Sequence, residues 1–149
     1  MSDPRELYQQ VIIEHNKKPR NFGRLEPCSH HAHGLNPLCG DDIEVSLQVE
    51  DGRVADIRFQ GHGCAISQAS SSLMTTTVKG RPTEEAELLV AQFREMIRGG
   101  LDPAVDPNIL GRLSIFQGVK DLPSRVKCAV LPWATLHSAL QGEALASTE

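Results

Sequence analysis

Several residue types that set the character of small proteins are scarce in this sequence of 149 residues. Only four cysteines are present, too few for a fold held together by disulfides. Aromatic residues make up 4% of the chain, which argues against a surface that stacks nucleic-acid bases. The 15 basic residues are outnumbered by 19 acidic ones, so no basic stripe can neutralise phosphates, and we expect no nucleic-acid partner.

Long apolar segments are also lacking. No apolar run approaches the roughly 20 residues that span a bilayer, and the N-terminal MSDPRELYQQ has no apolar region of a secretory signal. We therefore expect no membrane partner and a cytoplasmic location, where thiols stay reduced and more often bind metals or catalyse than form disulfides. The length suits a single domain over residues 1–149 that can bury a core without a metal or a disulfide.

The apolar pattern predicts an α+β fold, a small antiparallel sheet of about three strands with helices packed on one face. Asp51-Gly52 is a strong hairpin signal between two alternating segments. In the first, Ile43, Val45, Leu47 and Val49 alternate with polar residues, and in the second, Ala55, Ile57 and Phe59 do so. A short strand is expected from Ser29 to Leu35.

Helical spacing of apolar residues predicts the helices. They are expected over residues 3–19, with Asp3 as the N-cap, and over 65–79, 82–98 and, as a shorter piece, 109–116. Because proline disrupts a helix interior, we expect a turn that carries Cys128, then a last helix with Pro132 in its first turn. The tail after Gly142 is small and polar, and we expect it to be frayed.

Three of the cysteines lie at expected ends of helices or strands. Cys39 and Asp41 are two residues apart around Gly40, so in an extended segment both side chains point to one side and can address one metal ion. Cys64 follows a glycine-rich turn at a helix N-terminus, where the helix dipole favours a thiolate; the alternative is a small buried apolar residue.

Cys128 follows two cations, Arg125 and Lys127, which favour a thiolate and would offset the charge of a metal site. The alternative interpretation is that Cys128 is a packed core cysteine flanked by solvated charges. No CxxC pair is present, which excludes an ordinary zinc finger, and spacing alone is a weak signal for a three-cysteine metal site.

The remaining metal-binding residue types have no clear place in such a site. Cys28 lies in a connector before His30, His31 and His33, which the strand alternation divides between two faces. His62, close to Cys64, is either an acid, base or ligand, or a solvated turn histidine.

Four segments together resemble the IscU/SufU family of iron–sulfur cluster assembly proteins, and its SufU branch in particular. They cover nearly the whole chain and read LYQQVIIEHNKKPRN, NPLCGD, GHGCAISQASSSLMT and RVKCAVLPW. The resemblance implies an IscU/SufU-like (SufE/NifU-type) fold in which Cys39, Asp41, Cys64 and Cys128 converge on one exposed metal site. In SufU-like proteins the metal is Zn²⁺, and the residue that matches Cys39 accepts sulfur from a cysteine desulfurase, a pyridoxal-phosphate enzyme.

IscU-like relatives instead assemble a [2Fe–2S] cluster on the same cysteines. IscU-type chains carry a histidine immediately before the third cysteine, where this sequence has Lys127, and the stretch 82–118 looks like the insertion typical of SufU. We therefore expect a zinc-bound sulfur relay, with Arg125 balancing charge or holding a freed thiolate, that serves downstream iron–sulfur assembly or acceptor proteins. The alternatives are a non-enzymatic cluster scaffold and a structural zinc module.

Overall fold

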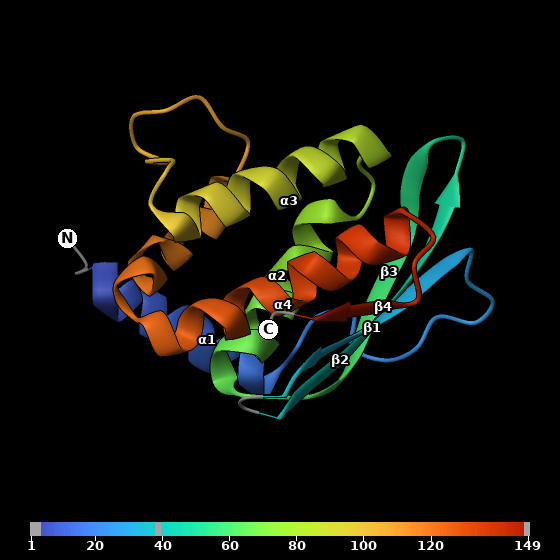
Figure 1. Cartoon of the computed structure of the whole chain (residues 1–149), viewed down its shortest axis with the longest axis horizontal. Helices are drawn as coiled ribbons and strands as arrows, with labels where there is room; N and C mark the ends of the chain where they lie inside the picture. The colour runs from blue at the N-terminus through green and yellow to red at the C-terminus, as the bar shows by residue number, and fades with distance from the viewer. Residues whose placement is uncertain (1–3, 38–39, 148–149) are drawn as a thin grey trace.

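The computed structural model describes residues 4–37 and 40–147 of the chain. Its elements in chain order are α1 (Pro4–Lys17), β1 (His30–Asn36), β2 (Asp41–Glu50), β3 (Arg53–His62), α2 (Ala65–Val78), α3 (Thr83–Arg98), the 3-10 helix η1 (Gly111–Asp121), α4 (Pro123–Leu140) and β4 (Leu145–Ser147). The α+β prediction is confirmed, and the helices lie against one side of the sheet (Figure 1). Asp3, the expected cap of α1, lies outside the described residues.

The hairpin of β2 and β3 forms where the sequence predicts it. Asp51 and Gly52 both have positive φ, 52° and 76°, as a two-residue type I′ turn requires. A shift in register between Gln48 and Val49 pairs Val49 with Val54, so Val54 is buried. The prediction that Ala55 shares a face with Ile57 and Phe59 is therefore wrong, because this irregularity leaves Ala55 without a partner in the β2–β3 register and exposed.

The sheet has four strands in the order β3-β2-β1-β4, one more than expected. β4 pairs in parallel with β1, and His33 N donates a hydrogen bond to Ala144 O at 2.8 Å. The expectation of a frayed tail is thus wrong for residues 145–147. Main-chain groups at the edge of β1 provide this pairing, which depends little on side-chain pattern.

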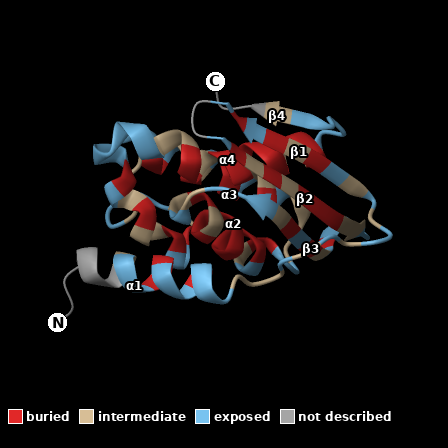
Figure 2. Cartoon of the chain, turned by 90° about the horizontal axis from the view of Figure 1, so that it is seen from below, coloured by how far each residue is buried: buried red, intermediate tan, exposed pale blue. Residues whose placement is uncertain are grey.

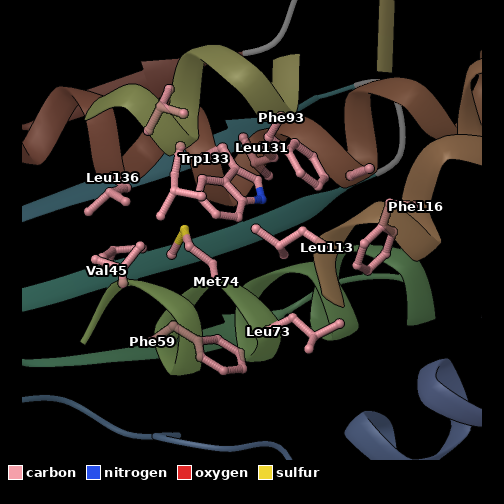
Figure 3. Packing of buried hydrophobic residues seen from close by; sticks show 14 of the residues in the cluster. Val45, Phe59, Leu73, Met74, Phe93, Leu113, Phe116, Leu131, Trp133 and Leu136 are labelled. Carbon is pink, nitrogen blue, oxygen red and sulfur yellow. The ribbon is translucent and has the colours of Figure 1, made fainter. Parts of the chain in front are cut away.

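The core lies between the sheet and the helices, and buried residues line the inner faces of both (Figure 2). α4 packs on β1 and β2, and α2 packs on β3 and α4. At the centre, the rings of Trp133 and Phe93 stack with centroids 4.8 Å apart, with Met74 and Leu113 nearby (Figure 3). Both aromatic side chains are fully buried.

Pro132 lies inside α4, and the prediction that it occupies the first turn of a separate helix is wrong. α4 continues past Pro132 because the residues before and after the proline are buried and because α2 supplies polar partners. Ser70 Oγ donates to Ala129 O at 2.7 Å and accepts a hydrogen bond from Trp133 Nε1 at 3.1 Å. Tertiary packing thus overrides a local propensity worth about 3 kcal/mol. Cys128 is therefore helical and does not lie in a turn.

The short helical piece expected over 109–116 is instead the longer η1, Gly111–Asp121. Its buried residues, Leu113, Phe116 and Val119, recur at every third position. That spacing matches the three residues per turn of a 3-10 helix and not the 3.6 of an α-helix. None of the helices among the described residues has the length and apolar character that crossing a membrane requires.

Candidate metal centre

Three elements bring Asp41, Cys64 and Cys128 together. Asp41 begins β2, Cys64 caps α2, and Cys128 lies in the N-terminal half of α4. These three ends gather on one side of the molecule (Figure 1), and one ligand atom of each residue lies within 4.8 Å of those of the other two. Residues separated by 23 and 64 positions thus form a single cluster of two sulfur atoms and a carboxylate oxygen.

Asp41 is held at the start of β2 by main-chain and side-chain contacts. It pairs with Asn36 across the β1–β2 connection, where Gly40 N donates to Asn36 O at 2.9 Å. Its side chain is almost fully buried, and Oδ1 accepts a hydrogen bond from Cys64 N at 2.9 Å. Oδ2 lies 3.9 Å from Cys64 Sγ. One carboxylate oxygen is therefore fixed by a main-chain donor, and the other faces a thiol.

Cys64 is the N-cap residue of α2, as the glycine-rich turn before it predicts. Its backbone is extended, with φ −70° and ψ 168°, and Sγ accepts a hydrogen bond from Ser67 N at 3.5 Å. The sulfur therefore occupies the capping position, where the free N–H groups and the helix dipole favour negative charge. A thiolate that serves as a metal ligand fits this location.

Gly61 and Gly63 allow the close approach of β3, Asp41 and α2. Gly61 has φ +128°, and a Cβ there would collide with Asp42 O. A Cβ on Gly63 would lie 2.8 Å from Asp41 Oδ1 and would collide with Ser67 Oγ. A side chain at either position would thus displace the carboxylate or the helix cap from the cluster.

Cys128 and the cations near it differ in exposure. Cys128 is fully buried, Lys127 is half-buried, and Arg125 is exposed in the first turn of α4. The charges of Arg125 and Cys64 both act on the phenol of Tyr8 in α1. Burial raises the pKa of Tyr8 above its ordinary value of 10.0, the negative charge of Cys64 raises it further, and the positive charge of Arg125 lowers it.

The other candidate residues lie apart from this cluster. Cys39 lies outside the described residues. Cys28 precedes Ser29, whose N–H donates to Leu47 O, six residues along β2 from Asp41 and so about 20 Å from it. Cys28 is thus remote from the site.

No histidine belongs to the cluster within residues 4–37 and 40–147. His33 Nε2 contacts Asp42 Oδ1, His30 contacts Ser29, and His31 and His62 are exposed. His62 pairs across the sheet with Asp42. A shallow cavity of about 180 Å³ borders Asp41 and is lined in part by Asp42, His62, Leu35 and Pro37. The site is therefore open on the side of this cavity.

The donor set suits zinc. Zinc prefers sulfur, imidazole and carboxylate ligands in a tetrahedron, with bonds of about 2.3 Å to sulfur and 2.0–2.2 Å to oxygen, so its ligand atoms are separated by roughly 3.5–3.8 Å. The Cys64–Asp41 separation of 3.9 Å agrees with this spacing, and all three donor atoms lie within 4.8 Å of one another. The three described residues can therefore supply three tetrahedral positions.

Two features of this site escape prediction from the sequence. The hydrogen bond from Cys64 N to Asp41 joins residues 23 positions apart, and no local pattern signals it. Tyr8 falls on the apolar stripe of α1, so its spacing predicts packing alone, although its pKa responds to Cys64 and Arg125.

Known proteins similar to this chain are iron–sulfur assembly proteins. The family described as NifU-like N terminal domain matches residues 7–129. The chain is 40% identical over 138 residues to the zinc-dependent sulfurtransferase SufU of Bacillus subtilis (strain 168), covering 92% of this chain and 91% of the relative. It is 38% identical over 138 residues to the iron–sulfur cluster assembly scaffold protein IscU of Streptococcus pyogenes serotype M1, covering 93% and 85%.

Solved structures agree with this assignment. The crystal structure of FiSufU, from the SUF system of Fervidobacterium islandicum AW-1, superposes with a TM-score of 0.83 at 35% identity, covering 91% of this chain and 97% of that one. A NifU-like N-terminal structure from Brucella abortus, at 24% identity and a TM-score of 0.76, shares the fold. The chain therefore belongs to the IscU/SufU family of iron–sulfur cluster assembly proteins, and to its SufU branch.

Proposed function

We propose that this protein is a sulfur relay that takes sulfur from the persulfide of a cysteine desulfurase and passes it to iron–sulfur assembly or acceptor proteins. The observation that carries the proposal is the cluster of Asp41, Cys64 and Cys128, a donor set suited to zinc in a relative of a zinc-dependent sulfurtransferase. Cys39, two residues before Asp41, is the proposed fourth ligand and the sulfur acceptor.

Zinc bound by these residues would keep their thiols deprotonated at neutral pH. A carboxylate ligand beside an open cavity distinguishes this arrangement from the closed Cys₄ or Cys/His sets of structural zinc sites. The open side gives an incoming persulfide a route to the site. This is why we prefer a relay to a structural zinc module.

The transfer itself is a thiol–disulfide exchange. The Cys39 thiolate attacks the outer sulfur of the desulfurase persulfide and forms a new S–S bond. The original S–S bond breaks, and its electron pair leaves with the desulfurase cysteine as a thiolate. Cys39 then carries the persulfide, and the exchange needs no external oxidant or reductant.

Arg125 has the role of a charge partner in this scheme. Three thiolates and one carboxylate carry four negative charges, of which Zn²⁺ neutralises two. Arg125 is exposed and lies three residues before Cys128 on α4, which is about one helical turn. It would attract an anionic persulfide and stabilise a freed thiolate.

The test is sulfur uptake measured by intact-protein mass spectrometry after incubation with a cysteine desulfurase and L-cysteine. The wild-type chain should gain a sulfur atom that a reductant removes, and Cys39→Ser should gain none. Cys28→Ser is the matched control, because Cys28 is remote from the site, and it should behave like the wild type. Sulfur uptake by Cys39→Ser equal to that of the wild type would overturn the proposal.

A second candidate function is a scaffold that assembles a [2Fe–2S] cluster as cargo on the same residues. Similar proteins named as IscU scaffolds favour it. Anaerobic reconstitution with iron and sulfide separates the two functions. A stable visible chromophore with stoichiometric iron and sulfide would support the scaffold, whereas tightly bound zinc that resists replacement supports the relay.

A further inference from the structure

A cavity of about 330 Å³ lies at the end of the sheet that is remote from the metal centre. It is bordered by the end of β2, the start of α3 and the end of α4, and its lining includes Val49, Glu84, Glu87 and Leu140. Val49 is eight residues along β2 from Asp41, a separation of roughly 26 Å. The cavity is therefore separate from the proposed sulfur relay, and its volume is in the range of small-molecule sites.

Two printed contacts hold the elements around this cavity in place. The start of α3 and the end of α4 lie on the same side of the molecule (Figure 1), and Glu87 Oε2 lies 2.8 Å from Nδ1 of His137, in the last turn of α4. Thr83 N donates to Gly52 O at 2.9 Å, which joins the start of α3 to the β2–β3 turn. The walls of the cavity are thus fixed to one another by hydrogen bonds.

The carboxylate of Glu87 is only partly satisfied. Oε2 contacts the imidazole of His137, but Oε1 is buried and has no hydrogen-bond partner among the described residues. A buried carboxylate oxygen without a donor costs free energy, and such a group calls for an explanation. Since Glu87 lines the cavity, a donor that occupies the cavity would supply the missing partner.

The other polar groups of the cavity favour a cationic occupant. Glu84 lies three residues before Glu87, on the same face of α3, and is exposed. His30 also lines the cavity, and its Nδ1 lies 2.8 Å from Ser29 Oγ. No lysine or arginine is among the described residues that line it. Two carboxylates therefore border a space that contains no permanent positive charge.

The spacing of these groups suits an organic cation better than a metal ion. Within residues 4–37 and 40–147, ligand atoms gather closely enough for a metal ion only at Asp41, Cys64 and Cys128. An ammonium or guanidinium group carries several N–H donors, which can contact two carboxylates that lie apart. The apolar side chains of Val49 and Leu140 suit the aliphatic stem of such a group.

We propose that this cavity binds an ammonium or guanidinium group on a short aliphatic chain, with Glu87 and Glu84 as its anionic contacts. This is the chemistry of a lysine or arginine side chain, which a partner protein or a free small molecule can present. An occupant would contact β2, α3 and α4 together and would stabilise the folded chain. The site does not depend on the proposed sulfur relay.

The test is a titration of isotopically labelled protein with n-butylammonium and n-butylguanidinium, followed by the NMR shifts of the backbone amides. Both cations should give saturable shifts of residues around the cavity, and the neutral analogue n-butanol should give none. Glu87→Gln keeps the shape of the side chain and removes its charge, and it should weaken cation binding by about tenfold or more. Asp121→Asn is the matched control, because Asp121 is an exposed carboxylate at the end of η1, and it should bind like the wild type.

Glu84→Gln keeps the test valid in a chain that has lost no buried group, because Glu84 is exposed. It should also weaken binding, by a smaller factor than Glu87→Gln. Binding of n-butanol equal to that of the cations, no saturable shift with either cation, or equal cation affinity in Glu87→Gln and wild type would each overturn the proposal.

The source of the cation is distinguished with the blocked peptide acetyl-Gly-Arg-Gly-amide. Binding of the peptide as tight as that of n-butylguanidinium supports a protein side chain as the occupant, whereas exclusion of the peptide supports a free small molecule. Zinc should leave the cation affinities unchanged, because the metal centre lies at the other end of β2. Failure of the metal centre and failure of this site are therefore distinguishable.

Discussion

The two halves of α4 lie in opposite environments. Its C-terminal half carries Trp133 and Leu136, both fully buried among apolar neighbours. Its N-terminal half carries Cys128, buried beside the carboxylate of Asp41. Burial of apolar surface stabilises a fold by roughly 25 cal/mol per Å², whereas burial of a charged group costs free energy unless it is paired. One half of this helix therefore stabilises the fold through apolar burial, and the other places a thiol beside a carboxylate at the proposed metal site.

We infer that the residues that stabilise the fold differ from those that would bind the metal ion. Among the described residues, Cys64 N donates a hydrogen bond to Asp41 Oδ1, and Asp41 Oδ2 faces the Cys64 sulfur. The proposed metal ion would place positive charge between this oxygen and the sulfur atoms. We therefore expect substitutions in the apolar region to change stability first, and substitutions around the metal centre to change metal affinity first.

The largest effect is expected at Trp133. Trp133→Ala removes the ring that stacks on Phe93 and should lower the free energy of unfolding by about 3–5 kcal/mol, measured by urea denaturation. The folded variant should keep the metal stoichiometry of the wild type. Val105→Ala is the control, because Val105 is 77% exposed, and it should change stability by less than about 0.5 kcal/mol. A Trp133→Ala protein that is stable but binds no metal would contradict the division.

Ser70 connects α2 to α4 next to Pro132. Ser70→Ala removes the donor to Ala129 O and the acceptor of Trp133 Nε1, so two buried polar groups lose a partner. The free energy of unfolding should fall by about 1–3 kcal/mol. Ser124→Ala, at an exposed position in the first turn of α4, is the control in the same denaturation experiment and should leave stability unchanged. Equal stability of the two variants would show that these hydrogen bonds do not support the helix around Pro132.

Gly63 tests the metal-centre side of the comparison. In Gly63→Ala the new methyl group would press on Asp41 Oδ1 and Ser67 Oγ, so the carboxylate must turn away from the thiols. Zinc affinity, measured by competition with a chromophoric chelator, should fall by about 10–100-fold, the usual range when groups that orient ligands are lost. Gly118→Ala, where a Cβ meets nothing within 4 Å, should bind zinc as the wild type does. An unchanged affinity in Gly63→Ala would mean that Asp41 is no ligand.

His15 gives the smallest expected effect, a pH dependence of stability. Burial lowers the pKa of His15 below its ordinary value of 6.5, and the charge of Arg20 lowers it further. Below pH 6.5 the unfolded chain therefore takes up a proton that the folded chain does not. This group's contribution to stability is thus intact above 6.5 and is lost as pH falls toward the lower folded-state pKa.

Urea denaturation of wild type and His15→Gln across this pH range measures that contribution. The stability difference between the two proteins should shrink as the solution becomes more acidic. Val105→Ala, at an exposed residue that does not titrate, is the control and should show no such trend. A difference that stays constant with pH would show that His15 titrates alike in the folded and unfolded chains.

The sequence predicts those parts of the structure that follow from local patterns. The alternation of Ile43, Val45 and Leu47 predicts β2, and the glycines before Cys64 predict its place at the start of α2. Pro132 misleads because its cost is local and the compensating contacts of Ser70 and Trp133 come from residues more than 60 positions apart. β4 is missed because main-chain pairing leaves little trace in side-chain pattern.

The candidate site divides in the same way. Spacing and charge single out Cys64 and Cys128 separately, and only the family resemblance groups them with Asp41. The structure adds the geometry that joins them, since Cys64 supplies both a sulfur atom and the amide that orients the carboxylate. The sequence does not signal that the Tyr8 hydroxyl lacks a hydrogen-bond partner among the described residues, because that depends on which groups the fold places around it.

We propose that Asp41, Cys64 and Cys128 hold a metal ion beside the N-terminal half of α4. The most direct test is titration of metal-free protein with Zn²⁺, following the thermal unfolding midpoint. The wild-type chain should bind one ion per chain with a rise in the midpoint, because a ligand that binds the folded state stabilises it. Asp41→Ala should show little or no rise at the same zinc concentrations. An equal rise in Asp41→Ala and wild type would contradict the claim.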